Sequence, residues 1–272
     1  MEFRTVFRAT AAVATVLITF PGTCRAIDVS EVRWGFDGQV SPQHFVPLSV
    51  LIINPGAEPF DGVIELRESI GARTSVGAPL AEEVYVAPQS SRWVQFYPFV
   101  KENFEEWSVE WGRRSGERAD VTAPVFADAK PVLLVDADDF STKGKGLRRF
   151  PENLFPPFVA ATDGLKTAVL DHAPRWEEPR RQAFYDWLFR GGRLHIFKGV
   201  DGNFPRFAVQ LAELNTPAEH FRVGGGEVFR HDKPLGPNDA ALLEPPAGPT
   251  DKQAAEKKTP EKKAPEKKAS AM

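Results

Sequence analysis

The sequence predicts an all-β, Ig-like sandwich followed by a short flavodoxin-like α/β domain with a parallel sheet, and then a disordered tail. Three observations indicate this order. Short runs of alternating polar and apolar residues fill positions 27–126, continuous apolar runs alternate with helical patterns over 127–233, and residues 234–272 are rich in Pro, Ala and Lys. A chain of 272 residues, 42% of them hydrophobic, is long enough to bury two cores.

Residues 1–26 have the parts of a secretory signal peptide: a basic head, an apolar run over 9–20, and a polar stretch that ends at Ala26. The run is shorter than the roughly 20 apolar residues that span a bilayer, so we expect cleavage after Ala26. The mature chain would then be periplasmic or extracellular, with no transmembrane helix. A lipoprotein signal ending at Cys24 and an uncleaved anchor are the alternatives. Cys24 is the only cysteine, so cleavage would also exclude disulfides and thiol chemistry.

Residues 27–126 supply roughly seven short strands, the number expected of a small sandwich. The clearest is 107–111, in which Trp107, Val109 and Trp111 share one face that should be core. Six aromatic residues of this domain could instead form a platform on which sugars stack: Trp34, Phe36, Trp93, Phe96, Trp107 and Trp111. We favour core packing for them, because buried aromatic side chains stabilise a sandwich without disulfides.

Residues 127–233 contain three continuous apolar runs, at 131–136, 167–171 and 193–197, which are typical of strands buried on both faces of a parallel sheet. Acids and a proline at 177–179 begin a helix that a glycine pair ends. A second helix is predicted over 205–214 and a hairpin over 221–229. A complete flavodoxin-like fold has five strands, so this domain is either truncated or completed by the hairpin.

The candidate ligand-binding residues follow the ends of the predicted parallel strands, where open α/β sheets bind ligands. They are Asp136, Asp138, Asp139, Asp171 and His172. Clustered carboxylates are able to hold Mg²⁺, and His172 beside Asp171 is able to act as an acid–base pair, which would suit a metal-dependent hydrolase. We favour strand-end and loop-capping roles instead, since such residues are common at these junctions. No catalytic residue, metal ligand or cofactor is assigned.

Other features narrow the choice of function. The five histidines show no metal-ligand spacing, and no Gly-x-Ser-x-Gly motif indicates a serine hydrolase. A net charge of −3 gives no overall basic field, which argues against a nucleic-acid binder. The tail repeats Glu-Lys-Lys with proline, so its lysines could contact an anionic membrane or polymer, although we favour a solubilising role.

The order of motifs also resembles a known family. Residues 168–171 followed by 180–188 and 191–194 resemble the class I glutamine amidotransferase-like domains of bacterial envelope proteins, and the preceding sandwich also fits them. The resemblance covers residues 30–232. The amidotransferase cysteine has no counterpart here and the C-terminal membrane segments are absent, so the resemblance implies no amidotransferase activity and carries over no catalytic residue.

These observations favour a non-catalytic protein over an enzyme. We expect an exported envelope protein that binds or scaffolds an envelope protein or a glycan through a degenerate amidotransferase-like domain. The alternatives are a metal-dependent hydrolase that uses the strand-end acids and a carbohydrate-binding module that uses the sandwich tryptophans.

Overall fold

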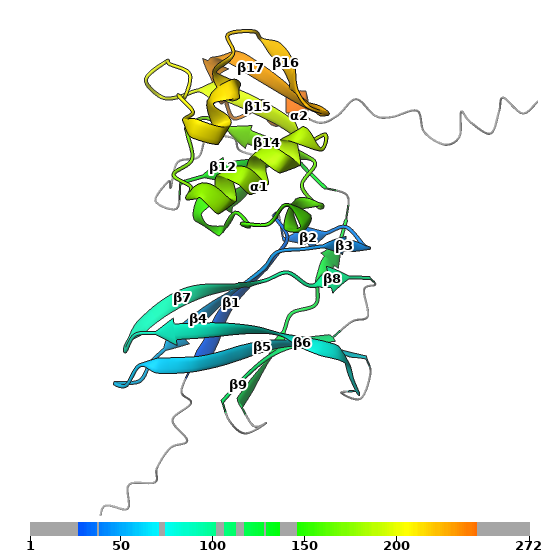
Figure 1. The fold of residues 1–272 in the computed structure, drawn as a ribbon, viewed down its shortest axis with the longest axis vertical. Helices are drawn as coiled ribbons and strands as arrows, with labels where there is room; N and C mark the ends of the chain where they lie inside the picture. The colour runs from blue at the N-terminus through cyan, green and yellow to red at the C-terminus, as the bar shows by residue number, and fades with distance from the viewer. Residues whose placement is uncertain are drawn as a thin grey trace, which may run out of the picture.

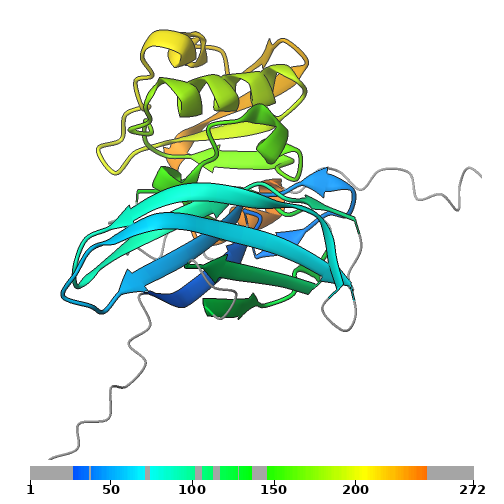
Figure 2. The same ribbon diagram turned by 60° about the horizontal axis from the view of Figure 1, so that its bottom comes forward.

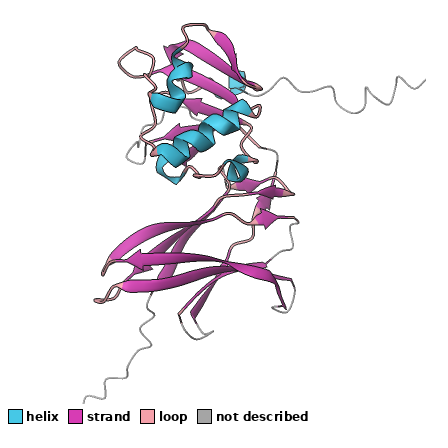
Figure 3. Ribbon diagram, viewed as in Figure 1, coloured by secondary structure: helices cyan, strands magenta, loops and turns pink. Residues whose placement is uncertain are grey.

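The computed structural model describes residues 27–36, 38–70, 74–101, 106–112, 117–127, 129–136 and 146–243. The predicted signal peptide and residues 244–272 of the predicted tail lie outside this part. The described chain forms an N-terminal unit of antiparallel sheets and a C-terminal unit built on one six-stranded sheet (Figure 1). Helices gather in the C-terminal unit, and the N-terminal unit consists of strands and loops (Figure 3).

The N-terminal unit has two main sheets, whose strands lie in layers in the turned view of Figure 2. The first has the order β1 (Asp28–Trp34), β4 (Leu48–Asn54), β7 (Ser90–Phe96). The second has the order β10 (Glu117–Val121), β9 (Glu106–Trp111), β5 (Phe60–Ile70), β6 (Thr74–Val86). All neighbouring strands are antiparallel.

One apolar core lies between these two sheets. Trp107, Val109 and Trp111 of β9 are buried in it, as the alternation along this strand predicts. Trp34 of β1 packs edge-on against Trp107, with ring centroids 5.8 Å apart. Ser108 is also buried, although the pattern predicts that it faces away from the core. Trp34, Trp107 and Trp111 therefore pack the interior of this unit.

Two short ribbons lie where the units meet (Figure 1). In one, β2 (Gln39–Val40) pairs in parallel with β11 (Val125–Phe126). In the other, β3 (His44–Phe45) pairs antiparallel with β8 (Phe99–Val100). The ribbons join distant parts of the N-terminal chain next to the C-terminal unit.

The sheet of the C-terminal unit has the order β13, β12, β14, β15, β17, β16. The first five are parallel, and β16 runs antiparallel to β17. The strands are β12 (Val132–Val135), β13 (Arg148–Pro151), β14 (Thr167–Leu170), β15 (Arg193–Lys198), β16 (His220–Val223) and β17 (Gly226–Pro234). The helix α1 (Glu178–Phe189) packs its buried side chains on one face of this sheet.

The prediction of a flavodoxin-like α/β domain is wrong. That fold alternates parallel strands with α-helices, whereas the described C-terminal unit has two α-helices, α1 and the four-residue α2 (Ala240–Leu243). Three 3₁₀ helices lie in its other connections: η1 (Glu152–Leu154), η2 (Val159–Thr162) and η3 (Val209–Asn215). The sheet also ends in an antiparallel hairpin.

Local sequence explains these connections. Prolines at 151, 156 and 157 cannot continue an α-helix, so the chain after β13 forms only short turns. The helix predicted over 205–214 is η3 instead. Its first residue, Val209, has a φ of 53°, and the Asn215 side chain bonds the main chain of Phe207 in both directions, at 2.9 and 2.7 Å.

The folded chain continues beyond residue 233, where the sequence places the start of the tail. Leu235 and Leu243 are buried in a small core on the second face of the sheet, against Leu133, Val169 and Phe197. The carboxylate of Asp239 accepts hydrogen bonds from Lys233 Nζ at 2.6 Å and the Gly236 N–H at 2.8 Å. Residues 234–243 therefore cover part of that face.

The two units are in direct contact. Phe36, in the turn after β1, is buried in the core of the C-terminal unit, where its ring lies 5.0 Å from that of Phe150 and 5.9 Å from that of Phe155. Gln95 of β7 donates a hydrogen bond from Nε2 to the main-chain oxygen of Leu154 at 2.6 Å. Part of the second core is thus completed by the first unit.

Candidate functional site

The carboxyl ends of the parallel strands meet at one edge of the six-stranded sheet, where polar residues follow them directly. Asp136 follows β12, Glu152 follows β13, and Asp171 follows β14. The loop 199–206 follows β15. This edge is the place where sheets of this kind bind ligands, so it is the candidate site.

His172 lies between two carboxylates at this edge. Its Nδ1 is 2.9 Å from Asp171 Oδ1, and its Nε2 is 2.9 Å from Glu152 Oε2. Glu152 and Asp171 are 5% and 7% exposed, so both acids are buried. Buried carboxylates require hydrogen-bond partners or a counter-charge, and the imidazole ring supplies both.

Glu152 also joins this cluster to the segment that precedes α1. Its Oε1 accepts a hydrogen bond from the Arg175 N–H at 3.2 Å, and its main-chain oxygen accepts one from Trp176 Nε1 at 2.7 Å. The indole of Trp176 packs against Phe155 and Phe184 in the core below. Glu152 therefore connects the end of β13, the end of β14 and the start of α1.

The pKa of His172 follows from these contacts. Burial alone would lower it, but the hydrogen bonds and negative charges of Asp171 and Glu152 outweigh burial and raise the pKa to about 9. The ring is then protonated at neutral pH, and both nitrogens donate. A protonated imidazole has no free lone pair, so it neither accepts a proton nor binds a metal ion.

Of the remaining predicted acids, only Asp136 lies within the described residues. Asp136 lies 3.9 Å from the guanidinium of Arg175, which is exposed. Asp138 and Asp139 lie outside the described residues. Within the described ranges, no three His, Cys, Asp or Glu residues converge as a metal site would require.

The structure thus brings together two of the five predicted residues, Asp171 and His172, and adds Glu152. The sequence analysis missed Glu152 because β13, the strand before it, was not recognised. The acid directly after this short segment was the signal that could have identified it.

An open depression with a volume of about 740 Å³ lies beside the cluster, lined by Asp171, His172 and the loop 199–206. The loop is held in shape from within. The Gly199 N–H donates to the main-chain oxygen of Asn203 at 2.8 Å. The main-chain and side-chain nitrogens of Asn203 each donate to the Asp201 carboxylate at 3.0 Å. These bonds lower the pKa of Asp201, so it stays ionised.

The aromatic residues considered for a sugar platform have a different placement. Five of the six are buried, with exposed fractions of 5% or less: Trp34, Phe36, Phe96, Trp107 and Trp111. Trp93 is half-buried, and the guanidinium of Arg33 lies 4.9 Å from the centre of its ring. Among the described residues of this set, no two rings form an exposed pair on which a sugar could stack.

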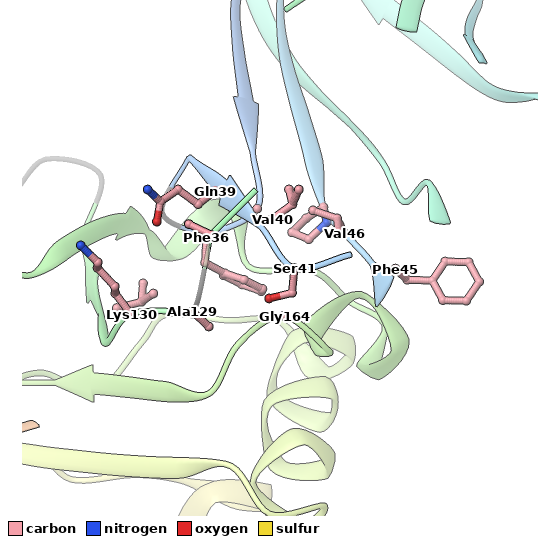
Figure 4. A pocket seen from close by; sticks show the side chains of 13 residues that line it. Phe36, Gln39, Val40, Ser41, Phe45, Val46, Ala129, Lys130 and Gly164 are labelled. Carbon is pink, nitrogen blue, oxygen red and sulfur yellow. The ribbon is translucent and has the colours of Figure 1, made fainter. Parts of the chain in front are cut away.

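A small cavity at the junction of the units is too small for a ligand. Figure 4 shows Phe36 among the side chains that line it and Phe45 pointing away from it. Its volume is about 10 Å³. A single water molecule needs roughly 10–15 Å³, so the cavity has room for one water molecule at most.

No family model and no curated protein sequence matches this chain. Among solved structures, the chain is similar to a cycloisomaltooligosaccharide glucanotransferase of Paenibacillus sp., complexed with cycloisomaltoheptaose. The identity is 12% and the TM-score 0.31, over 62% of this chain and 28% of that one. This chain therefore spans less than a third of that protein, and a likeness at this level supports no conclusion about function. The resemblance to amidotransferase-like domains has no family match to support it.

None of the helices in the described part of the chain has the length and apolar character needed to cross a membrane.

Proposed function

We propose that this chain is an exported envelope protein that binds a protein or glycan partner without catalysing a reaction on it. One observation carries the proposal: the two ring nitrogens of His172 both bond to buried carboxylates, at 2.9 Å each. The three groups most able to perform acid–base chemistry at the candidate site therefore satisfy one another. They act as a clamp that holds three segments of the chain together.

The depression beside the clamp is the proposed binding surface. Val200, near the tip of the loop 199–206, is 98% exposed, and the hydrogen bonds between Asp201 and Asn203 fix the loop beneath it. A loop that is internally bonded and projects an apolar side chain loses little conformational freedom on binding. Such loops suit recognition of a partner.

Site-specific photo-crosslinking tests this proposal. A photo-reactive amino acid replaces Val200 in the full chain, in cells of its source. Val125 of β11 serves as the control, because it is also exposed, at 58%, but does not line the depression. We expect one partner, identified by mass spectrometry, to crosslink from position 200 and not from 125. Equal crosslinking at both positions, or none at 200, would contradict the proposal.

Two further measurements separate binding from catalysis and test export. Purified protein is screened for hydrolysis with Mg²⁺, in parallel with Asp171→Asn and Asp136→Asn variants. Turnover that disappears in these variants would support the hydrolase instead. Sequencing of the mature N-terminus is expected to begin at Ile27, and an intact N-terminus in the cytoplasm would contradict export.

A further inference from the structure

A second depression lies between the turn after β1 and the edge strand β13. Its volume is about 450 Å³, and three of the residues that line it are arginines: Arg33, Arg148 and Arg149. None of the described lining residues is acidic. The whole chain has a net charge of −3, so this concentration of positive charge is local.

The guanidinium of Arg33 has a fixed orientation. Its Nε donates a hydrogen bond to Glu31 Oε1 at 2.6 Å, and the group lies 4.9 Å from the centre of the Trp93 ring. These contacts use Nε and one face of the group, and no residue in the described ranges accepts a hydrogen bond from its two terminal nitrogens. A guanidinium that is already oriented loses little entropy when it binds an anion.

The other two arginines come from adjacent positions of β13. Arg148 is exposed and forms no ion pair with any residue in the described ranges. Arg149 is half-buried and has a further interaction of its own. Of the three arginines, Arg148 is therefore the cation most available to a ligand.

Two glycines, Gly35 and Gly38, also line the depression. Gly35 has a φ of 59°, and a Cβ atom there would overlap the main-chain oxygen of Gln39, so the turn requires glycine. Gly38 has a φ of 79° and no other atom within 4 Å of the position a Cβ would take. The absence of side chains at these two positions leaves room for a group to approach the arginines.

From these features we infer that the depression binds a phosphate group. Guanidinium groups match the oxygens of phosphate through paired N–H donors, and a phosphate can carry two negative charges where a carboxylate carries one. Arg148, which has no ion pair among the described residues, and Arg33, which pairs with one carboxylate, together suit the larger charge of phosphate. The phosphate can belong to a free anion or to a lipid headgroup, and the chemistry of recognition is the same.

Calorimetric titration of the mature full chain with inorganic phosphate at low ionic strength tests the inference. We expect Arg148→Gln to weaken binding by at least about tenfold, the loss typical of a hydrogen bond between charged groups. Arg222→Gln is the matched control, because Arg222 is exposed on β16 and has no ion pair among the described residues. Every variant keeps the lysine-rich tail, so phosphate held by the tail cannot account for a difference between them.

Phosphate binding by the parent chain and by three variants tests the inference. Absence of phosphate binding to the parent chain, or equal affinity in the parent and Arg148→Gln, would overturn it. Thermal melting checks that each variant is folded, and Arg33→Gln gives an independent second loss of affinity. Asp37 stands between two lining residues in the sequence but lies outside the described part. Asp37→Asn should keep or increase the affinity, and a decrease would count against the site.

Vesicles that contain an anionic phospholipid distinguish the two sources of the phosphate. Flotation that depends on Arg148, and that inorganic phosphate does not displace, would assign the site to a lipid headgroup. Binding of inorganic phosphate without flotation would assign it to a free anion. This site is separate from the depression at the carboxyl ends of the strands, so failure here leaves the proposed function unaffected.

Discussion

Replacing His172 with glutamine would remove the positive charge between two buried carboxylates. Asp171 and Glu152 would then lie close together without a counter-charge, since glutamine is neutral and reaches them less well. Removing one partner of a buried ion pair costs about 3–5 kcal/mol. We therefore expect His172→Gln to lower the free energy of unfolding by about that amount at pH 6.

The pH dependence of the free energy of unfolding gives a second estimate of what His172 contributes to stability. The pKa of His172 rises from 6.5 to about 9 in the folded protein, because the bonds to Asp171 and Glu152 outweigh the effect of burial. One pKa unit corresponds to about 1.4 kcal/mol, so the shift is worth about 3 kcal/mol. Below pH 6.5 the folded and unfolded states both carry the proton and the stabilisation is complete. Between pH 6.5 and 9 only the folded state keeps it, so stability falls as the pH rises.

Urea unfolding at pH 6 and pH 9.5 measures this effect in the parent chain, in His172→Gln and in His44→Gln as a control on β3. The parent and the control should each lose about 3 kcal/mol more than His172→Gln over this interval. Heteronuclear NMR should show protons on both ring nitrogens of His172 at pH 7. A neutral ring at pH 7, or an equal pH dependence in parent and His172→Gln, would refute the reasoning.

Three further perturbations test other contacts. Phe36→Ala should cost about 3–5 kcal/mol in urea unfolding, because it empties a buried ring site between the two units, and an unchanged midpoint would contradict their shared core. Gly226→Ala should lower the melting temperature, since the new Cβ would overlap the main-chain oxygen of Leu188. Gly164→Ala is the control, because a Cβ at that position meets open space, and it should change stability by about 0.5 kcal/mol or less. Burial, with the charges of His231 and Arg193, lowers the pKa of His195 to about 3. As the pH falls from 6.5 to 3, the unfolded chain therefore gains a proton at this position before the folded chain does, and stability falls with the pH. His195→Phe should make the fall in stability with pH less steep when unfolding is measured across this range.

The elements that sequence predicts correctly are those that local patterns define. The run 107–111 lies within β9, the hairpin over 221–229 corresponds to β16 and β17, and the helix that begins near 177 is α1. Alternation, turn residues and a proline in the first helical turn act over a few residues, so they can be identified without knowing what packs nearby.

The elements that sequence misses depend on distant partners. β13 contains two arginines and ends in Pro151, so its own residues do not indicate a strand. It forms because its main chain pairs with β12 from Val132 to Val135. Residues 234–243 contain two prolines and a glycine and show no strand or long helical pattern, yet Leu235 and Leu243 fill a gap on the second face of the sheet that only the folded structure creates.

The candidate site shows how one distant residue changes the chemistry that a local motif indicates. Asp171 beside His172 resembles an acid–base pair, in which the second ring nitrogen is free to exchange a proton with a substrate. Glu152, 20 positions away, binds that nitrogen at 2.9 Å. Each ring nitrogen then donates its own proton to a carboxylate, so neither is free to exchange a proton with a substrate. The pKa moves to about 9, away from the range that suits a general base at neutral pH. β13 and β14 both run parallel to β12, on either side of it, so Glu152 and His172 follow strands that end at the same edge of the sheet. The strand that the sequence conceals therefore also changes the interpretation of the motif from catalysis to structure.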